Sequence, residues 1–423
     1  MTDYIKDIIS IIENLDDEYE YNNIKELNNY VYENLIFIYP DFDKELFKKT
    51  MNKLLKLKYV IDHDRYIPIH NLEKIVVPEN QKELVEHVEY IGNLPQPEQR
   101  TEEWFKMREN MLTASTAAQV IGKNPYRDQK PENLILEKIF GREFIDNEYV
   151  HHGKKYEEIA TMIYENIYNI KVKEYGLIPH PDYDFLGASP DGIATYKTLD
   201  NNFSDMIGRM LEIKCPYTRK IKIKGKINGS ICPHYYWCQV QQQLECCDLD
   251  KCDFWQCSII EYKNRNEWLK DEHTDKINTE EQDQEKFLLN TCKKGCIIQL
   301  QPKNKQFDEF KSVYIYPNEV DMSCIEYEQW ILEEISNFYN SKYYNDYVFD
   351  RILYWKLVKS HNVVIDRDTK WFEDNLPKYK ELWEKVKYYR ANPKEAEKLK
   401  KKLYPNKIDF LSSSDEEYDD DET

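Results

Sequence analysis

Two acidic residues and a lysine fall at the ends of two neighbouring strands that the sequence predicts. Asp191 lies in a turn after the first strand, and Glu212 and Lys214 are two residues apart on the next. Because residues i and i+2 of a strand share a face, we expect the three side chains to lie close together at one end of the two strands. Two carboxylates and a carbonyl such as that of Ile213 form a hard-oxygen site suited to Mg²⁺. The pattern indicates phosphodiester hydrolysis by metal-activated water, and a surface hairpin with an ordinary charge pair is the alternative.

Two predicted helices near these strands carry further polar side chains. Glu157 lies on a helix expected at about 153–167, where a carboxylate could reach the same cluster, although an exposed helical glutamate is commoner. Gln239 lies on a helix expected at 234–245, with Gln243 one turn later on the same face. Amide groups in a carboxylate-lined cleft can bind water or phosphate without adding charge. We therefore expect both helices to contribute to the cleft.

Hydroxyl and basic side chains form two candidate phosphate-binding groups. Arg108 precedes Thr113 and Ser115 near the start of a further helix, and guanidinium, hydroxyl and backbone N–H groups all donate to phosphate. A simple helix cap is the alternative for the two hydroxyls. The second group is a basic strip at 219–226, which is either a phosphate-binding segment or a solvated lysine-rich loop. Its candidate residues are Arg219, Lys220, Lys222 and Lys224.

Hydrophobic periodicity and turn residues predict the elements that must position these side chains. The segment 91–99 is rich in breakers and predicts a domain boundary. The expected units are a helical N-terminal domain at 1–92, a catalytic domain at 93–342 with a polar insertion at about 263–305, a helical C-terminal extension at 343–411, and a disordered acidic tail at 412–423. Within the catalytic domain we expect strands at 172–178, 186–195, 210–216, 254–262 and 313–316, and helices at 101–109, 153–167, 234–245 and 325–339.

Composition argues against a membrane-embedded or secreted protein. Of the 423 residues 32% are charged, the apolar stretches are too short to span a bilayer, and no secretory signal pattern opens the chain. We expect an intracellular protein in a reducing compartment, with its ten cysteines as free thiols. The net charge of −19 alone argues against a polyanionic partner, but acids concentrate in the tail while 219–226 is basic.

Five sequence blocks together resemble a known family. The chain is similar to the lambda-type exonuclease, or YqaJ-like viral recombinase, family of the PD-(D/E)xK nuclease superfamily. The resemblance covers about residues 100–262, with all blocks in family order. The blocks are W-F-K-M-R-x-x-x-L-T-A-S at 104–115, G-K-K-Y-E at 153–157, G-A-S-P-D-G at 187–192, L-E-I-K-C-P-Y at 211–217 and W-C-Q-V-Q at 237–241.

The resemblance implies a restriction-endonuclease-like α/β (α+β) core, with a mixed central sheet flanked by helices and with helical N- and C-terminal additions. It implies hydrolysis of duplex DNA from a 5′ end with two Mg²⁺ or Mn²⁺ ions. By motif, Asp191, Glu212 and the Ile213 carbonyl would ligate metal, Lys214 would position the water, Glu157 would hold the second metal or its water, and Gln239 would assist. The residues that would grip phosphate or DNA are Arg108, Thr113, Ser115, Ser189, Arg219, Lys220, Lys222 and Lys224.

The resemblance also implies partners and a setting. Family members are often ring-shaped trimers acting beside a single-strand annealing protein. We expect a homo-oligomer here, either a trimer or a dimer, although the terminal segments could block or replace a subunit contact. The family's viral character suggests DNA recombination, repair or processing in host cytoplasm or a viral factory. No iron–sulfur cluster is expected, because no cysteine precedes Cys215.

Two other functions remain open. The same metal site could serve an endonuclease or a single-strand or flap nuclease. Alternatively, the chain could be a catalytically idle DNA-binding module, although the two acids and the lysine are all present.

Overall fold

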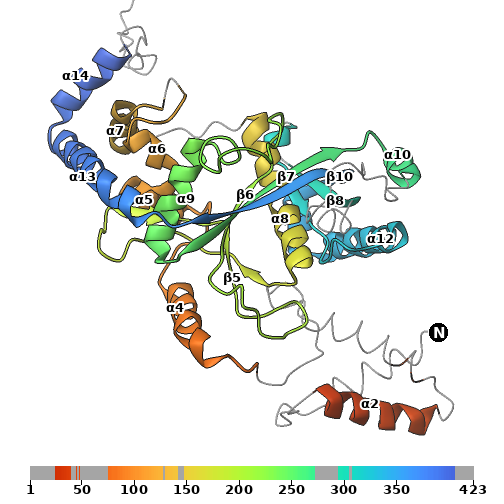
Figure 1. The fold of residues 1–423 in the computed structure, drawn as a ribbon. Helices are drawn as coiled ribbons and strands as arrows, with labels where there is room; N and C mark the ends of the chain where they lie inside the picture. The colour runs from red at the N-terminus through yellow and green to blue at the C-terminus, as the bar shows by residue number, and fades with distance from the viewer. Residues whose placement is uncertain are drawn as a thin grey trace, which may run out of the picture.

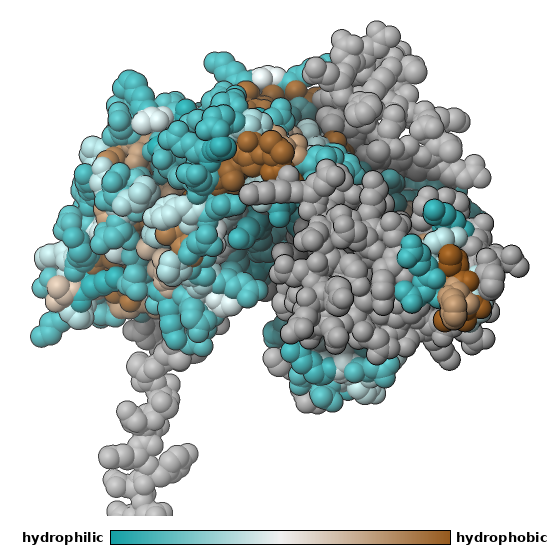
Figure 2. All heavy atoms as spheres, turned by 90° about the horizontal axis from the view of Figure 1, so that it is seen from below, coloured by the Kyte–Doolittle hydropathy of each residue, from teal (hydrophilic) through white to brown (hydrophobic). Residues whose placement is uncertain are grey.

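The computed structural model describes residues 24–39, 44, 47, 75–126, 129–141, 147–271, 294–303 and 307–404. The predicted acidic tail at 412–423 lies outside these ranges. Among the described helices, none is long and apolar enough to cross a membrane. On the face seen in Figure 2, hydrophobic side chains form small groups among hydrophilic ones.

A seven-stranded mixed sheet forms the centre of the fold (Figure 1). The mixed central sheet that the resemblance implies is therefore confirmed. The strand order is β2-β5-β6-β7-β10-β8-β9. β6 and β7 pair in parallel, and the other neighbours pair antiparallel. The strands are β2 (Val172–Lys173), β5 (Gly192–Ala194), β6 (Met210–Lys214), β7 (Lys251–Glu261), β8 (Lys294–Pro302), β9 (Val313–Ile315) and β10 (Tyr347–Asp366).

A second sheet has three short strands in the order β1-β4-β3: β1 (Leu112–Thr113), β4 (Leu186–Ala188) and β3 (Ile178–Pro179). Each of the strands predicted at 172–178 and 186–195 is therefore two strands, one in each sheet. Within the predicted strand 186–195, Ser189–Asp191 separates β4 from β5. Proline cannot donate a ladder hydrogen bond, so Pro190 favours ending β4 there. The interruption releases Asp191 from regular pairing.

Helices cover both faces of the central sheet around β6, and the residues of this strand are therefore buried on both sides. Alternate residues of β6 belong to different cores, with Met210 packed on the side of α9 and Leu211 on the side of α8. Figure 1 shows these two helices on either side of the strands. The helices of this body are α4 (Lys82–Asn93), α5 (Glu102–Glu109), α6 (Ala117–Val120), α7 (Pro131–Phe140), α8 (Glu148–Tyr168), α9 (His234–Cys247), α10 (Arg265–Lys270), α12 (Cys324–Asn340), α13 (Thr369–Ala391) and α14 (Pro393–Leu403).

Local caps explain where the site-bearing helices begin. The Thr101 hydroxyl accepts a hydrogen bond from the Trp104 N–H at 3.3 Å, which caps α5 at the predicted place. The Asn147 side chain accepts from the N–H groups of Tyr149 and Val150 at 3.0 and 3.1 Å, so α8 begins five residues before the predicted start. The predicted helix 234–245 is α9, which ends where Asp248 adopts a left-handed conformation.

The C-terminal extension predicted as helical at 343–411 begins instead with β10, so that prediction is wrong for 347–366. This strand lies between β7 and β8 and pairs with both. The helical prediction holds for α13 and α14. The central sheet therefore draws on residues beyond the expected end of the catalytic domain at 342.

Two further expectations need correction. β8 lies inside the polar insertion expected at 263–305, because seven of its nine residues are buried in the sheet. The boundary expected at about 92 does not separate cores: α4 packs Val85, Val88 and Ile91 into the cluster that also contains Leu112. Elsewhere in the N-terminal region, which was expected to be helical, the structure describes the helix α2 (Ile24–Ile38). All nine described cysteines are free thiols, and Cys292 lies outside the described residues.

Candidate active site

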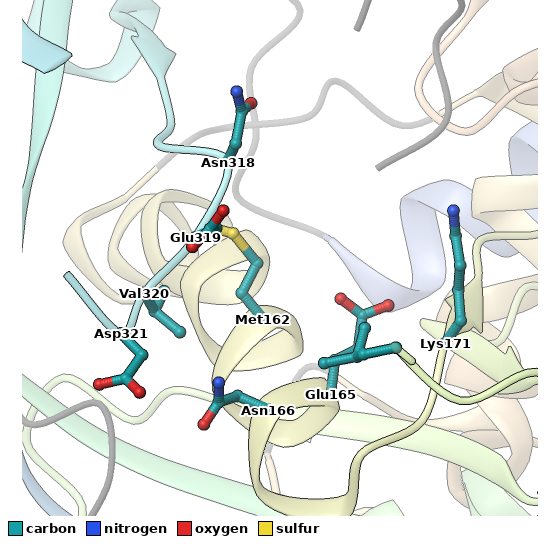
Figure 3. A pocket seen from close by; sticks show the side chains of 9 residues that line it. Met162, Glu165, Asn166, Lys171, Asn318, Glu319, Val320 and Asp321 are labelled. Carbon is teal, nitrogen blue, oxygen red and sulfur yellow. The ribbon is translucent and has the colours of Figure 1, made fainter. Parts of the chain in front are cut away.

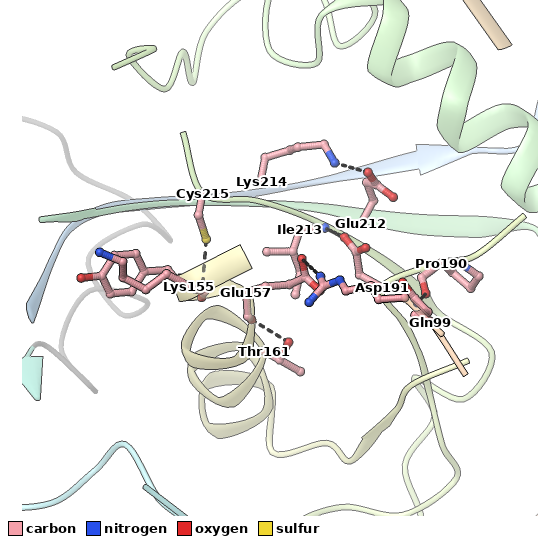
Figure 4. A network of polar contacts seen from close by, with 12 residues as sticks. Gln99, Lys155, Glu157, Thr161, Pro190, Asp191, Glu212, Ile213, Lys214 and Cys215 are labelled. Atoms are coloured by element: carbon pink, nitrogen blue, oxygen red, sulfur yellow. Dashed lines mark hydrogen bonds and ion pairs between the residues drawn. The ribbon is translucent and has the colours of Figure 1, made fainter. Parts of the chain in front are cut away.

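Asp191 lies directly across from Glu212 at one end of the central sheet. The antiparallel register pairs Gly192 with Leu211. Asp191, before Gly192, and Glu212, after Leu211, are therefore opposite each other. The Asp191 Oδ2 atom accepts a hydrogen bond from the Ile213 N–H at 2.6 Å (Figure 4). A side chain at position 192 would meet Val172 Cγ1 at 2.2 Å, so only glycine allows β2 to approach here. Local backbone packing thus fixes the Asp191 carboxylate against β6.

The Glu212 carboxylate is fully buried and is held by three donors. Gln239 Nε2 donates to Oε1 at 2.8 Å, and Gln243 Nε2 donates to Oε2 at 2.7 Å. The Lys214 ammonium also binds Oε1, consistent with the shared strand face of residues two apart. A buried charge is tolerated when it is paired and hydrogen-bonded, as it is here. The two α9 glutamines therefore orient the glutamate.

Glu157 approaches this cluster from α8, on the other side of the sheet. Figure 4 shows its side chain turned from the helix toward Asp191 and Ile213. Its carboxylate binds the Arg100 guanidinium, with N–O distances of 3.1 and 3.2 Å. The structure therefore brings Glu157, Asp191, Glu212 and Lys214 together at one edge, as the sequence predicts.

The cluster shifts the pKa values of its members. Burial, and then the neighbouring charges of Glu212 and Glu157, raise the pKa of Asp191 well above its usual value. Burial alone would lower the pKa of Lys214, but the carboxylates of Glu212 and Asp191 outweigh it, and the net effect is a raised pKa. The lysine therefore stays an ammonium group at neutral pH.

The predicted phosphate-binding residues form a connected series beside this cluster. Arg108 donates to the Ser115 hydroxyl at 3.2 Å, and that hydroxyl lies 3.3 Å from the Thr113 hydroxyl. The Arg108 guanidinium also lies 4.2 Å from the centroid of the Trp104 ring, whose N–H donates to the Ser189 hydroxyl at 3.0 Å. Burial lowers the pKa of Arg108 to about 10, which leaves it charged at neutral pH. The continuous stretch 104–115 and the distant Ser189 therefore meet in this group.

The predicted basic strip divides into two parts. Arg219 lines the cavity that contains Lys214, and its guanidinium donates to the Gln256 side chain at 3.0 Å. Lys220, Lys222 and Lys224 are exposed on the loop after β6 and do not line that cavity. The structure thus brings Arg219 to the cluster but not the three lysines.

The donor set of the cluster fits a hard divalent cation. Asp191, Glu212 and Glu157 are carboxylates, the ligand type that Mg²⁺ prefers, and the Ile213 carbonyl adds a neutral oxygen. Among the described residues, the ion pairs of these three carboxyl groups involve two cations, Lys214 and Arg100. In the described part of the chain, no three His, Cys, Asp or Glu side chains are grouped as a ready-formed metal centre.

Comparison with known proteins gives the family of this region. Residues 103–250 match the YqaJ-like viral recombinase domain. We call this part of the chain the YqaJ-like domain. It contains every residue of the acidic cluster and of the phosphate-binding series described above.

Matches to individual proteins cover more of the chain than residues 103–250. A protein of Acanthamoeba polyphaga mimivirus, named as uncharacterized, is 38% identical over 319 residues, which are 74% of this chain. The chain spans only 56% of that relative's length. An alkaline exonuclease from Laribacter hongkongensis is 19% identical with a TM-score of 0.36, and the match covers 72% of this chain and 99% of that one. A phage-related exonuclease from Haemophilus somnus is 14% identical with a TM-score of 0.31, covering 67% and 96%.

A second, smaller cavity of about 150 Å³ lies at the far half of α8 in the YqaJ-like domain (Figure 3). Glu165 and Asn166 line it from the helix, and 318–321 lines it from the loop before α12. Glu165 accepts a hydrogen bond from the Val172 N–H at 2.8 Å, so this carboxylate holds β2 in place. The cavity contains none of the predicted site residues.

The sequence did not predict three residues that position the site residues by direct contact. Arg100 pairs with Glu157, and no local pattern marks it. Gln99 donates to the carbonyls of Tyr175 and Pro190 at 2.8 and 3.2 Å, which fixes the turn before Asp191. Trp104 connects Arg108 to Ser189, and its place in the 104–115 block was the available signal.

Proposed function

We propose that this chain is a metal-dependent deoxyribonuclease that digests duplex DNA from an end. One observation carries the proposal: within the YqaJ-like domain, Asp191, Glu212 and Lys214 converge with Glu157 at one end of the central sheet. A site of oxygen ligands with an adjacent ammonium group suits phosphodiester hydrolysis better than nucleophilic covalent catalysis. The match to a viral recombinase domain supports a role in DNA recombination, repair or processing, and the mimivirus relative supports a viral setting.

Each residue would have a defined task. Asp191, Glu212, the Ile213 carbonyl and Glu157 would hold one or two Mg²⁺ or Mn²⁺ ions. Such an ion supplies an acidified water and positive charge beside the scissile phosphate. Lys214 would orient the attacking water, because its ammonium group stays charged and is fixed on Glu212. Gln239 would hold the same carboxylate in its ligating orientation.

Dependence on a DNA end would come from the phosphate-binding series. Arg108, Thr113, Ser115 and Ser189 present a guanidinium and three hydroxyls, which together suit a terminal phosphate. We assign them to a 5′-phosphate, which gives digestion from 5′ to 3′. Arg219 would contact the DNA backbone within the cleft. A homo-oligomer and a single-strand annealing partner are further parts of this proposal.

The test compares linear with covalently closed duplex DNA in Mg²⁺. We expect the wild-type chain to consume only the linear DNA, and Asp191→Ala and Lys214→Ala to lose at least about 100-fold of that rate. Labels at the 5′ or 3′ end then give the direction. Lys387→Ala serves as the control, because this lysine on α13 pairs with Glu384 and does not line the cavity.

Other outcomes would point elsewhere. Equal cutting of closed circles would retain the metal site and replace the exonuclease by an endonuclease. If Arg108→Ala digested linear DNA from its ends as fast as the wild type, the assignment of the phosphate-binding series to a DNA end would be wrong. No cutting with any divalent metal would leave the idle DNA-binding module.

A further inference from the structure

A cavity of about 510 Å³ opens beside Lys214, and its aromatic lining consists of tyrosines. The charged residues of its lining are mostly basic: Arg100, Lys154, Lys214 and Arg219, against the single acid Glu157. The nuclease proposal uses the lysine and the acid but gives the rings no task. The five tyrosines are Tyr126, Tyr149, Tyr217, Tyr235 and Tyr236.

Three of these rings form a series that starts at the candidate catalytic lysine. The Lys214 Nζ atom lies 4.7 Å from the centroid of the Tyr236 ring. Tyr236 contacts Tyr235 at a centroid distance of 4.2 Å, and Tyr235 contacts Tyr126 at 5.7 Å with an interplanar angle of 68°. The series leads from the buried end of the cleft to Tyr126, whose side chain is 59% exposed.

The other two rings form a separate pair in the same lining. Tyr149 and Tyr217 meet edge to face, with centroids 5.9 Å apart and an angle of 82°. They are 61% and 51% exposed, respectively. Such exposure contributes little apolar burial to folding, so packing alone does not account for these rings. An edge-to-face contact uses the edge of one ring and one face of the other, and Tyr217 also contacts the His152 ring at a centroid distance of 5.2 Å. The exposed remainder of both tyrosine rings is available to a ligand.

We propose that this cavity binds unpaired nucleobases of the DNA strand being cut, by stacking them on the tyrosine rings. Aromatic rings in a basic groove are the usual means of holding single-stranded nucleic acid, because every base has a π-face and every nucleotide a negative phosphate. Lys154 and Arg219 would supply the positive charge for the backbone. The inference rests on the proposed nuclease function and names the form of its substrate: a strand whose bases next to the cut are separated from their partners.

The test measures stacking without cleavage. The full-length chain carrying Asp191→Asn is titrated with a 12-nucleotide single strand that contains 2-aminopurine, whose fluorescence falls when it stacks on a ring. We expect the double change Tyr126→Ala and Tyr217→Ala to weaken binding by roughly 5- to 100-fold and to restore the aminopurine fluorescence. The matched phenylalanine changes keep the rings and should stay within about twofold of the parent.

Controls separate stacking from unfolding and from general DNA binding. Tyr339→Ala removes a ring that is 50% exposed on α12 and outside the cavity, and should leave binding unchanged. Urea unfolding of each variant shows whether the fold persists. Equal affinity of parent and alanine variants would overturn the inference, and so would a loss in the phenylalanine variants as large as in the alanine variants.

The inference and the proposed function can fail separately. If the wild-type chain cuts no DNA in any divalent metal but still quenches aminopurine through Tyr126 and Tyr217, the nuclease proposal fails and the stacking site stands. If the wild-type chain digests linear DNA while the alanine variants bind and quench like the parent, the stacking site fails and the nuclease stands.

Discussion

The Arg390 guanidinium on α13 donates a hydrogen bond to the backbone carbonyl of Glu109, 281 residues earlier, at 2.8 Å. The same guanidinium donates to the carbonyl of Lys138 and to the side chain of Asn110. Arg108 precedes the accepting carbonyl, and its own carbonyl accepts from the Lys138 ammonium at 2.5 Å. A residue outside the YqaJ-like domain therefore holds the backbone on which the candidate phosphate-binding arginine sits.

The change Arg390→Ala should weaken this support. Arg108 itself is retained, so we expect a higher KM for linear DNA, by roughly tenfold, with a smaller change in kcat, and a loss of about 1–3 kcal/mol in unfolding free energy. Steady-state digestion of 5′-phosphorylated DNA and urea unfolding measure the two effects. Lys387→Ala on the same helix is the control, since that lysine only pairs with Glu384 one turn away. An unchanged KM would show that Arg108 needs no support from α13.

The change Gln243→Leu should destabilise the protein more than Gln239→Leu. Gln243 is buried and donates to Glu212 Oε2, so its loss leaves a buried carboxylate oxygen without this donor. Gln239 is partly exposed, and water can replace its amide group. We expect a loss of about 1–3 kcal/mol in unfolding free energy for the first change and less for the second. Tryptophan fluorescence during urea unfolding measures both, and equal losses would contradict the role given to burial.

The sequence predicted the part of the site that depends on local geometry. Strand alternation places Lys214 beside Glu212, and the Pro-Asp-Gly turn delivers Asp191 to the same edge. Helical spacing likewise predicts that Gln239 and Gln243 share a face, and both do bind Glu212. These relations involve residues a few positions apart or on adjacent strands. The roles assigned to them remain predictions.

Contacts between residues far apart in the sequence could not be predicted from local patterns. Trp355 of β10 pairs with Glu261 of β7 and with Gly295 of β8, so its strand character depends on partners far away in the chain. The β10 strand mixes exposed, partly buried and buried positions without strict alternation, and its register shifts near residues 350 and 358. The pairing of Arg100 with Glu157 has the same origin, since only the folded chain brings the two together.

A chain that ends at residue 342 should fail to fold, whereas a chain that ends at residue 404 should fold. The shorter chain lacks β10, which lies between β7 and β8, and its absence would expose the edges of both. The longer chain keeps every described element. Circular dichroism during heating and size-exclusion chromatography compare the two. Cooperative unfolding of the shorter chain at the temperature of the longer one would contradict the central place of β10.

Stability should depend on pH through Lys138. Burial, and then the charge of Arg108, lower the pKa of Lys138 from its ordinary value of 10.5 to about 8. Between these values the unfolded chain binds more protons than the folded chain, so this lysine makes unfolding free energy rise with pH from about 8 to 10.5. Below pH 8 both states hold the proton, and the penalty is constant.

The difference in unfolding free energy between Lys138→Met and the wild type should therefore be constant below pH 8 and should shift in favour of the wild type, by on the order of 1 kcal/mol, as pH rises to 10. Urea unfolding at pH 7, 8, 9 and 10 measures this, with the exposed Lys387→Met as the control whose difference should not change. A difference for Lys138→Met that stays level across this range would show that the lysine is charged in the folded protein up to its ordinary pKa.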